Sequence, residues 1–234
     1  WDSDRLFGGE RAIARALRRD FEEMGGFPAT GRVLVLAGKG HNGGDALIAA
    51  TRLREEFPAA TVEVQFVFGE RALRPLAQRA WRELAEKGGR AVNRAGGAYD
   101  LCLDGVFGFQ FKPPADPAVA ALLAQVNALP IRLRAAVDLP SAGLFQADFT
   151  YATGSVKTPL LESPVAGRVR YLDLGFFEGE RVAPNASARV LTPAVLTPLT
   201  QLRPPQSDKR TYGHLVVVAG SRDYPGAALM TVLA

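Results

Sequence analysis

Short apolar runs alternate with amphipathic patterns along the first 180 residues. The runs at 31–38, 99–108 and 131–138 are rich in Val, Leu and Ala, which is typical of strands buried on both faces of a parallel sheet. Ile13, Leu17 and Phe21 recur at four-residue spacing, which predicts a helix over 10–22. The remaining patterns predict helices over 45–57, 75–89 and 116–129 and strands over 61–68, 147–153 and 167–175. This alternation favours an α/β fold, a three-layer α/β/α Rossmann-like domain with a mostly parallel sheet.

The pattern changes near residue 180. Five prolines and no strong periodicity over 182–206 are typical of a linker. A new apolar run, "GHLVVVAGS" at 213–221, predicts a strand, and "GAALMTVLA" at 226–234 predicts the start of a helix. A strand and one helix do not form a core by themselves. The sequence therefore predicts a first domain over 1–190, a proline-rich linker over 191–206, and the truncated start of a second α/β domain over 207–234.

Composition narrows the class of protein. The chain of 234 residues is 47% hydrophobic and 22% charged, which suits a globular domain with a sizeable core. No apolar run has the length of a membrane span, and Lys and Arg form no basic stripe, so neither a membrane nor a nucleic acid is expected as a partner. One cysteine, Cys102, and two histidines make a structural zinc site improbable and suit a reducing, cytoplasmic compartment.

Polar groups follow three of the apolar runs. The first run leads into "AGKGHNGGDALIAA" at 37–50, the second contains Asp104, and the third ends at Asp138 and Ser141. In open parallel sheets, ligands bind at the carboxyl ends of strands, and a helix N-terminus behind a glycine-rich loop suits an anion. The loop has a plainer interpretation, in which Gly43, Gly44 and Asp45 make only a tight turn and a helix cap.

Three ordered motifs resemble those of the YjeF N-terminal domain, the NAD(P)HX epimerase. They are "GKGHNGGDALIAATRL" at 38–53, "LDGVFG" at 103–108 and "AAVDLPS" at 135–141. The segment "KRTYGHLVVVAGSRDYPGAALM" at 209–230 resembles the opening of the YjeF C-terminal domain, a ribokinase-like NAD(P)HX dehydratase that uses ADP or ATP with Mg²⁺. The resemblance implies a bifunctional nicotinamide-nucleotide repair enzyme. It also implies that the nucleotide site and the dehydratase activity are missing from these 234 residues.

The resemblance also implies roles for individual residues. Asn42, Asp104 and Ser141 would bind K⁺, and Asp138 would be the catalytic acid/base that contacts the hydrated nicotinamide ring of NAD(P)HX. Carboxylates positioned at a reacting carbon are common general acids and bases. A homo-oligomer is possible, and the preference between NADHX and NADPHX is open. The full set of implied substrate-binding residues is His41, Asn42, Gly43, Gly44, Asp45, Gly108, Lys112 and Asp138.

The chain departs from the family pattern at several positions. His41 stands in place of an asparagine, Ala46 in place of a common glycine, and "GFQFKPP" at 108–114 in place of "GTGLxR". The altered loop leaves open a non-catalytic binding or scaffold module. An ordinary NAD-dependent dehydrogenase is disfavoured, because the glycine spacing is different and only Glu70 lies near the position of a ribose-binding acid.

Overall fold

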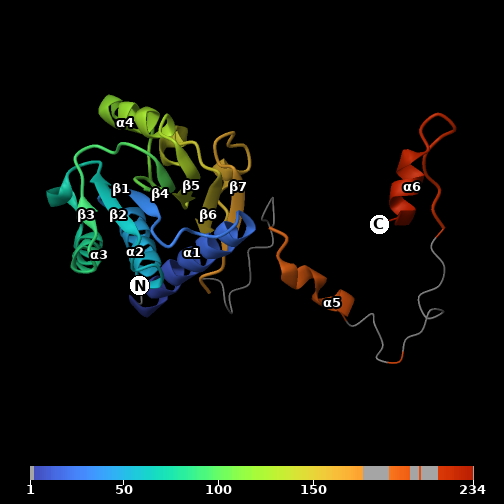
Figure 1. Ribbon diagram of the computed structural model, residues 1–234, viewed down its shortest axis with the longest axis horizontal. Helices are drawn as coiled ribbons and strands as arrows, with labels where there is room; N and C mark the ends of the chain where they lie inside the picture. Colours follow the sequence, from blue (N-terminus) through green and yellow to red (C-terminus); the bar gives the residue numbers. More distant parts are fainter. Residues whose placement is uncertain (1–2, 176–189, 201–205, 207–215, 234) are drawn as a thin grey trace. The chain divides into compact units, whose positions relative to one another are not determined.

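The computed structural model describes residues 3–175, 190–200, 206 and 216–233, with side chains described from Ala12 onward in the first helix. Contacts divide the chain into two units, Trp1–Val182 and Ala183–Ala234. The first unit contains the sheet and its covering helices (Figure 1).

A seven-stranded sheet with the order β3-β2-β1-β4-β5-β6-β7 forms the centre of the first unit. Every strand pair in it is parallel, as the apolar runs predict. The order begins 3-2-1-4, as in Rossmann-type sheets, so the chain reverses direction across the sheet between β1 and β4. The strands are β1 (Arg32–Ala37), β2 (Thr61–Phe66), β3 (Arg90–Ala91), β4 (Tyr99–Gly105), β5 (Ile131–Val137), β6 (Phe149–Thr153) and β7 (Arg168–Leu172).

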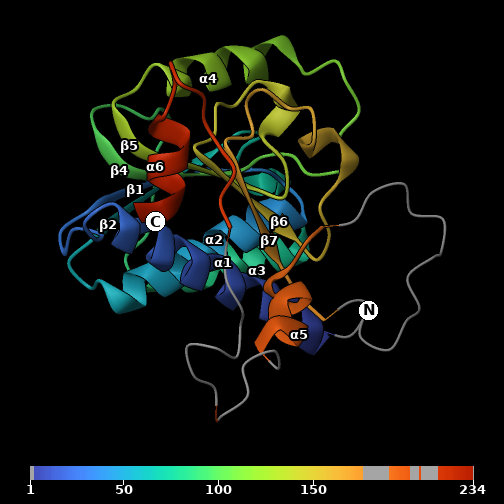
Figure 2. The ribbon, with the colours of Figure 1, turned by 90° about the vertical axis from the view of Figure 1, so that its right-hand side faces the viewer.

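Helices cover both faces of this sheet (Figures 1 and 2). Helices α1 (Ser3–Glu23), α2 (His41–Glu56) and α3 (Pro75–Glu86) share one core cluster with the strands, and α4 (Pro117–Asn127) belongs to the other. Ile13, Leu17 and Phe21 are fully buried, so their spacing does mark the inner face of α1. The predicted three-layer α/β/α arrangement is confirmed.

Helix α2 begins four residues earlier than its pattern predicts. His41–Asp45 form its first turns, with Gly40 as the N-cap, instead of a loop. Glycine disfavours a helix by about 1 kcal/mol relative to alanine, but Gly43 and Gly44 are buried here, so tertiary packing outweighs local propensity. Helix α1 likewise begins at Ser3 and not near residue 10.

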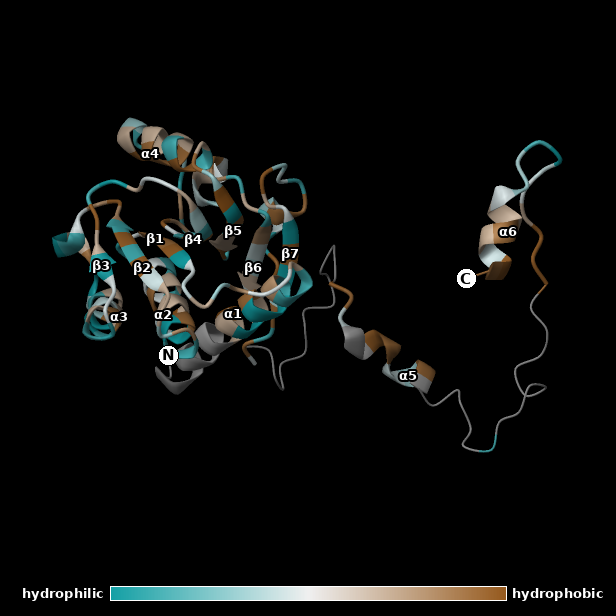
Figure 3. Cartoon of the chain, in the orientation of Figure 1, coloured by the Kyte–Doolittle hydropathy of each residue, from teal (hydrophilic) through white to brown (hydrophobic). Residues whose placement is uncertain are grey.

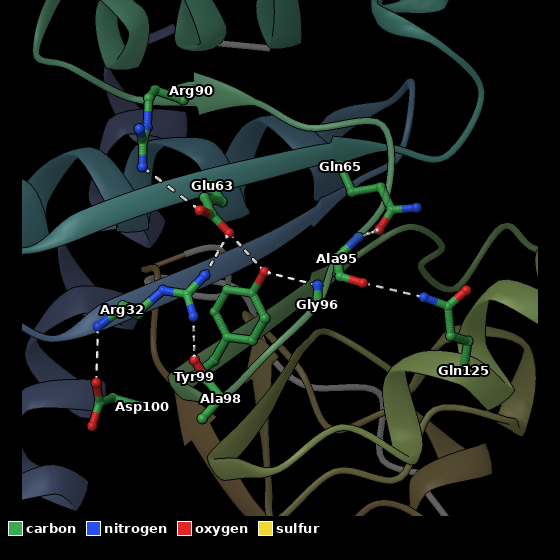
Figure 4. Close-up of polar contacts among 10 residues, drawn as sticks. All are labelled: Arg32, Glu63, Gln65, Arg90, Ala95, Gly96, Ala98, Tyr99, Asp100 and Gln125. Carbon is green, nitrogen blue, oxygen red and sulfur yellow. Dashed lines mark hydrogen bonds and ion pairs between the residues drawn. The ribbon is translucent and has the colours of Figure 1, made fainter.

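Structural contacts occupy the amino-terminal side of the sheet (Figure 4). Glu63 of β2 accepts hydrogen bonds from Arg32 (3.1 Å) and from the Tyr99 hydroxyl (2.6 Å), and it pairs with Arg90. The Arg32 amide donates to Asp100 over 2.8 Å. These contacts join β1, β2, β3 and β4, so the groups here already have partners within the fold.

Short 3₁₀ turns complete the first unit: η1 (Glu70–Ala72), η2 (Ser141–Gly143) and η3 (Thr158–Leu160). The second unit contains η4 (Pro193–Leu196), α5 (Thr197–Thr200) and α6 (Gly226–Leu233). Residues 193–200 thus form helical turns inside the predicted linker. No helix in the described ranges combines the length and apolar character that crossing a membrane requires.

The predicted strand at 213–221 is wrong over its described part. Residues 216–220 have no strand structure, and Val216 and Val218 are 79% and 94% exposed. A strand requires a hydrogen-bonded neighbour, and none is present for these residues in the part of the chain that the structure describes. Helix α6 forms as predicted and carries no charged residue, so it is drawn in pale to brown colours in Figure 3.

Candidate functional site

The polar groups of the three motifs lie at the carboxyl ends of adjacent strands. Strands β1 and β4 are neighbours, but the helix after β1 packs on one face and the helix after β4 on the other. Such a reversal leaves a crevice at the strand ends, where ligands bind in open α/β sheets. The site is therefore built from the β1–α2 junction, the segment after β4 and the turn after β5.

Glycines let the backbones at this junction pack directly on one another. A β-carbon on Gly38 would overlap the carbonyl oxygen of Val106, and one on Gly43 would overlap the carbonyl oxygen of Gly38. A β-carbon on Gly105 would lie 2.5 Å from the carbonyl oxygen of Asn42. The close approach that these glycines permit is thus between backbone segments, which fixes the start of α2 over the end of β4.

A chain of hydrogen bonds through the Phe107 backbone links Asn42, Asp104 and Ser141. The Asn42 amide donates to the carbonyl oxygens of Phe107 (3.1 Å) and Val137 (2.9 Å). The Phe107 amide donates to the Ser141 hydroxyl oxygen over 2.9 Å, and that hydroxyl donates to Asp104 over 2.6 Å. The three side chains therefore join the ends of β1, β4 and β5.

Asp104 is fully buried and well supplied with hydrogen bonds. Its carboxylate accepts from the Ser141 amide (2.7 Å), the Ser141 hydroxyl and the Val106 amide (3.2 Å). Burial raises the pKa of Asp104 to about 6, against the lowering effect of these donors. A nearby cation would favour the charged form of this carboxylate.

The donor set fits a hard monovalent cation. One amide, one hydroxyl and one carboxylate lie beside two backbone carbonyl groups, and oxygen ligands of these kinds suit such ions. No cluster of three or more His, Cys, Asp and Glu side chains occurs in the described residues. Asn42, Asp104 and Ser141 are the residues here that would hold such a cation.

Asp138 follows β5 directly and has an unusual backbone conformation. Its φ is +70°, in the left-handed region that non-glycine residues seldom adopt. Its amide donates to the Tyr151 carbonyl over 2.9 Å, which holds the turn against β6. The side chain is nearly buried and accepts a hydrogen bond from the Phe109 amide at 3.2 Å. Backbone strain of this kind is concentrated at functional sites.

Asp45, in the first turns of α2, is the third carboxyl group at this edge. It is half-buried. Desolvation raises its pKa from 3.8 to about 7, and the negative charge of Asp138 adds to the shift. Near neutral pH the site thus contains one carboxyl group that is partly protonated and one that forms an ion pair with Lys157. Two carboxyl groups in such different surroundings are a common acid/base arrangement.

The raised pKa of Asp45 makes a prediction about stability. Its folded-state value of about 7 lies above the ordinary value of 3.8, so the folded protein binds this proton more tightly. The resulting stabilisation is present at low pH and is lost as the pH rises toward 7. Between pH of about 5 and about 8, the wild type should lose about 2–3 kcal/mol of unfolding free energy relative to Asp45→Asn. Urea unfolding of both proteins at the two pH values, without potassium, measures this; equal losses would contradict the assignment.

The other predicted substrate-binding residues differ in their surroundings. Gly108 faces Asn42, and a β-carbon there would lie 2.5 Å from the Asn42 Oδ1 atom. His41 and Lys112 are exposed at the surface. A pocket of about 290 Å³ opens at the turn after β5, next in sequence to Asp138, which is not itself a lining residue. It is lined by Phe107, Gly108, Phe109, Phe111, Pro113, Leu139, Pro140, Ala142, Gly143, Pro159 and Ser163. Its lining is mostly apolar and aromatic, and two of its aromatic residues, Phe109 and Phe111, belong to the segment that departs from the family pattern.

Lys157 and Thr153 are site residues that the sequence analysis missed. The Lys157 ammonium forms an ion pair with Asp138, and the Thr153 hydroxyl lies 3.4 Å from the same carboxylate oxygen. A signal for Lys157 does exist, since it follows the strand next to β5 and so belongs to the same edge of the sheet. The motifs at 38–53, 103–108 and 135–141 do not extend that far.

Residues 10–159 match the family described as YjeF-related protein N-terminus. The chain belongs to this family. It is 36% identical to a protein of Gloeobacter violaceus named bifunctional NAD(P)H-hydrate repair enzyme Nnr, over 94% of this chain and 46% of that protein. It is 41% identical to a protein of Bordetella pertussis named NAD(P)H-hydrate epimerase, over 49% of each.

The chain spans about half the length of the curated relatives that it matches. A solved structure, the crystal structure of yeast ynu0 (YNL200c), superposes with a TM-score of 0.51 at 22% identity. The match covers 64% of this chain and 70% of the yeast chain. At that identity the likeness shows a shared fold, in agreement with the Rossmann-like sheet of this YjeF-family member.

Proposed function

We propose that this chain epimerises the R and S forms of NAD(P)HX, the hydrated forms of NADH and NADPH. The observation that carries the proposal is the presence of two carboxyl groups at the carboxyl edge of the sheet: Asp138, in an ion pair with Lys157, and Asp45, whose pKa burial raises to about 7. Relatives named for NAD(P)H-hydrate epimerisation and repair support the choice of substrate.

The proposed chemistry needs one proton donor and one proton acceptor. Asp45 protonates the hydroxyl group of the hydrated ring, the carbon–oxygen bond breaks, and water leaves as the ring nitrogen supplies its electron pair. A water molecule then adds to the opposite face of the same carbon and gives its proton to the Asp138 carboxylate. General acid and base groups positioned in this way contribute about 10²–10⁴-fold each to a rate.

The apolar pocket at the turn after β5 supports a ring substrate. Phe107 stacks on Phe111 at 4.3 Å between ring centroids, and Phe109 is 61% exposed at the pocket. Such a lining excludes water from a reacting ring more readily than a charged one would. The experiment that tests the proposal is incubation of purified chain with R-NADHX and chromatographic separation of the two epimers over time. A rate equal to that of the spontaneous reaction would favour the non-catalytic binding module.

The dehydrogenase alternative receives no support from Glu70. Its carboxylate accepts a hydrogen bond from the Trp81 indole nitrogen at 2.9 Å. That bond fixes Glu70 against α3, where it has a structural partner already.

A second activity, the ADP- or ATP-dependent dehydration with Mg²⁺, belongs to our proposal for the longer bifunctional protein, as do a homo-oligomeric state and a cytoplasmic location.

We further propose that Asn42, Asp104 and Ser141 hold K⁺, which would neutralise Asp104 and tie the segments after β1, β4 and β5 together. Potassium should then raise both the midpoint of thermal unfolding and the epimerisation rate, because a ligand that binds only the folded state stabilises it. In Asn42→Ala both responses should disappear. Melting curves and rates in potassium against matched choline salts measure this. An equal potassium response in Asn42→Ala would contradict the site.

A further inference from the structure

The Lys157–Asp138 ion pair lies in the candidate site, and Lys157, unlike Asp138, has no role in the proposed proton transfers. Its side chains are only 14% and 9% exposed, respectively. No other ion pair to Asp138 occurs among the described residues. A buried pair of this kind contributes little net stability, because the desolvation of both ions offsets their attraction. Its presence beside the reacting edge therefore calls for a functional reason.

Two contacts hold the Lys157 ammonium in place. Gly154, with φ of +70°, turns the chain directly after β6 and allows residues 154–157 to fold back. The ammonium donates to the Thr153 carbonyl oxygen over 2.7 Å and also contacts the Oδ1 atom of Asp138. The position of the ammonium is thus set by the end of β6 and not by Asp138 alone.

The two oxygens of Asp138 have different surroundings. Oδ1 faces the Lys157 ammonium and, at 3.4 Å, the Thr153 hydroxyl. Oδ2 accepts only the Phe109 amide, at 3.2 Å, among the contacts of the described residues. Phe109 also lines the apolar pocket. Holding Oδ1 from the β6 side therefore directs Oδ2 toward the pocket-lining segment.

We propose that Lys157 is a positioning residue of the reaction, which holds the Asp138 carboxylate by its Oδ1 atom so that Oδ2 stays directed toward the backbone of Phe109, a pocket-lining residue. This inference rests on the proposed function. Lys157 acts through Asp138 and does not itself transfer a proton. A positioning role of this kind affects the turnover step more than substrate binding, since a misplacement of about 1 Å can lower a rate by up to about 10²-fold.

The test compares Lys157→Met, which keeps the length of the side chain and removes the charge, with Lys157→Arg, which keeps the charge. We expect kcat for R-NADHX to fall about tenfold in the Met variant with KM changed less than about threefold, and the Arg variant to recover most of the loss. Lys87→Met is the matched control, because Lys87 forms exposed ion pairs with Glu55 and Glu83 at the end of α3. Its kcat should equal that of the wild type.

A double-mutant cycle separates action through Asp138 from an independent effect. If Lys157 works through Asp138, adding Lys157→Met to Asp138→Asn should lower kcat no further. A full tenfold further loss, wild-type kcat in the Met variant, or no recovery by arginine would each overturn the inference. Lys157→Gln replaces the Met variant if the latter does not fold. Wild-type activity in Asp138→Asn would instead contradict the proposed function, so the two failures are distinguishable.

Discussion

Asp138→Asn is expected to lower the rate of NAD(P)HX epimerisation by about 10²-fold or more while the protein stays folded. The substitution keeps the shape of the side chain and removes its ability to accept a proton. Asparagine also tolerates the left-handed backbone at this position, where φ is +70°, better than most residues do. The measurement is the initial rate of S-epimer formation from R-NADHX, with circular dichroism to confirm the fold.

Asp116→Asn is the matched control for this prediction. Asp116 is the exposed N-cap of α4, where its side chain accepts the Ala118 amide at 2.8 Å. Asparagine caps a helix about as well as aspartate does, so this variant should have the rate and the stability of the wild type. Near-normal epimerisation in the Asp138 variant would show that another group accepts the proton.

Gly43→Ala is expected to destabilise the fold by about 3 kcal/mol, because the added methyl group would overlap the carbonyl oxygen of Gly38. Both atoms of the overlap are fixed by the backbone, so no side chain can rotate to relieve it. For a chain of this size, the midpoint of thermal unfolding should fall by about 6–12 °C. Calorimetry or thermal circular dichroism measures the shift.

The neighbouring Gly44→Ala provides the control with the same chemical change. A β-carbon on Gly44 would lie 3.6 Å from the Ala77 Cα atom, an ordinary van der Waals contact. Alanine is also preferred over glycine in a helix by about 1 kcal/mol. This variant should therefore be as stable as the wild type or slightly more stable. Equal destabilisation by the two substitutions would show that the start of α2 is sensitive to any methyl group.

The candidate site could be predicted in part because parallel sheets gather strand ends at one edge. Asp104 lies near the end of one apolar run and Asp138 and Ser141 lie at the end of another, and the structure does bring Ser141 into contact with Asp104. The predicted roles of these residues in binding K⁺ and substrate stay predictions. Lys157 was missed because its relation to Asp138 depends on the pairing of β6 with β5 and on the turn at Gly154, which a motif search does not capture.

Local pattern alone determined the α/β/α architecture of the first unit. Every sheet strand except the two-residue β3 was predicted. The bounds of α1 to α4 were predicted within a few residues, except for the N-terminal start of α1. These predictions succeed because the periodicity of apolar residues reports which face of an element is buried. The segment at 216–220 shows the limit of such patterns. Its valines have the composition of a strand, but a strand forms only where a neighbour supplies hydrogen bonds, and in the described residues none does.

Tertiary structure decided where α2 begins and which state each carboxyl group adopts. Four residues from His41 to Gly44 have poor local helix propensity, yet they are helical because Gly43 and Gly44 pack against Gly38 and Ala77. Asp45 and Asp138 are the same residue type, but burial raises the pKa of Asp45 while Lys157 pairs with Asp138. Sequence fixes which groups are present, whereas the free energy of each charged group depends on its solvent exposure and neighbours, and only the folded chain sets these.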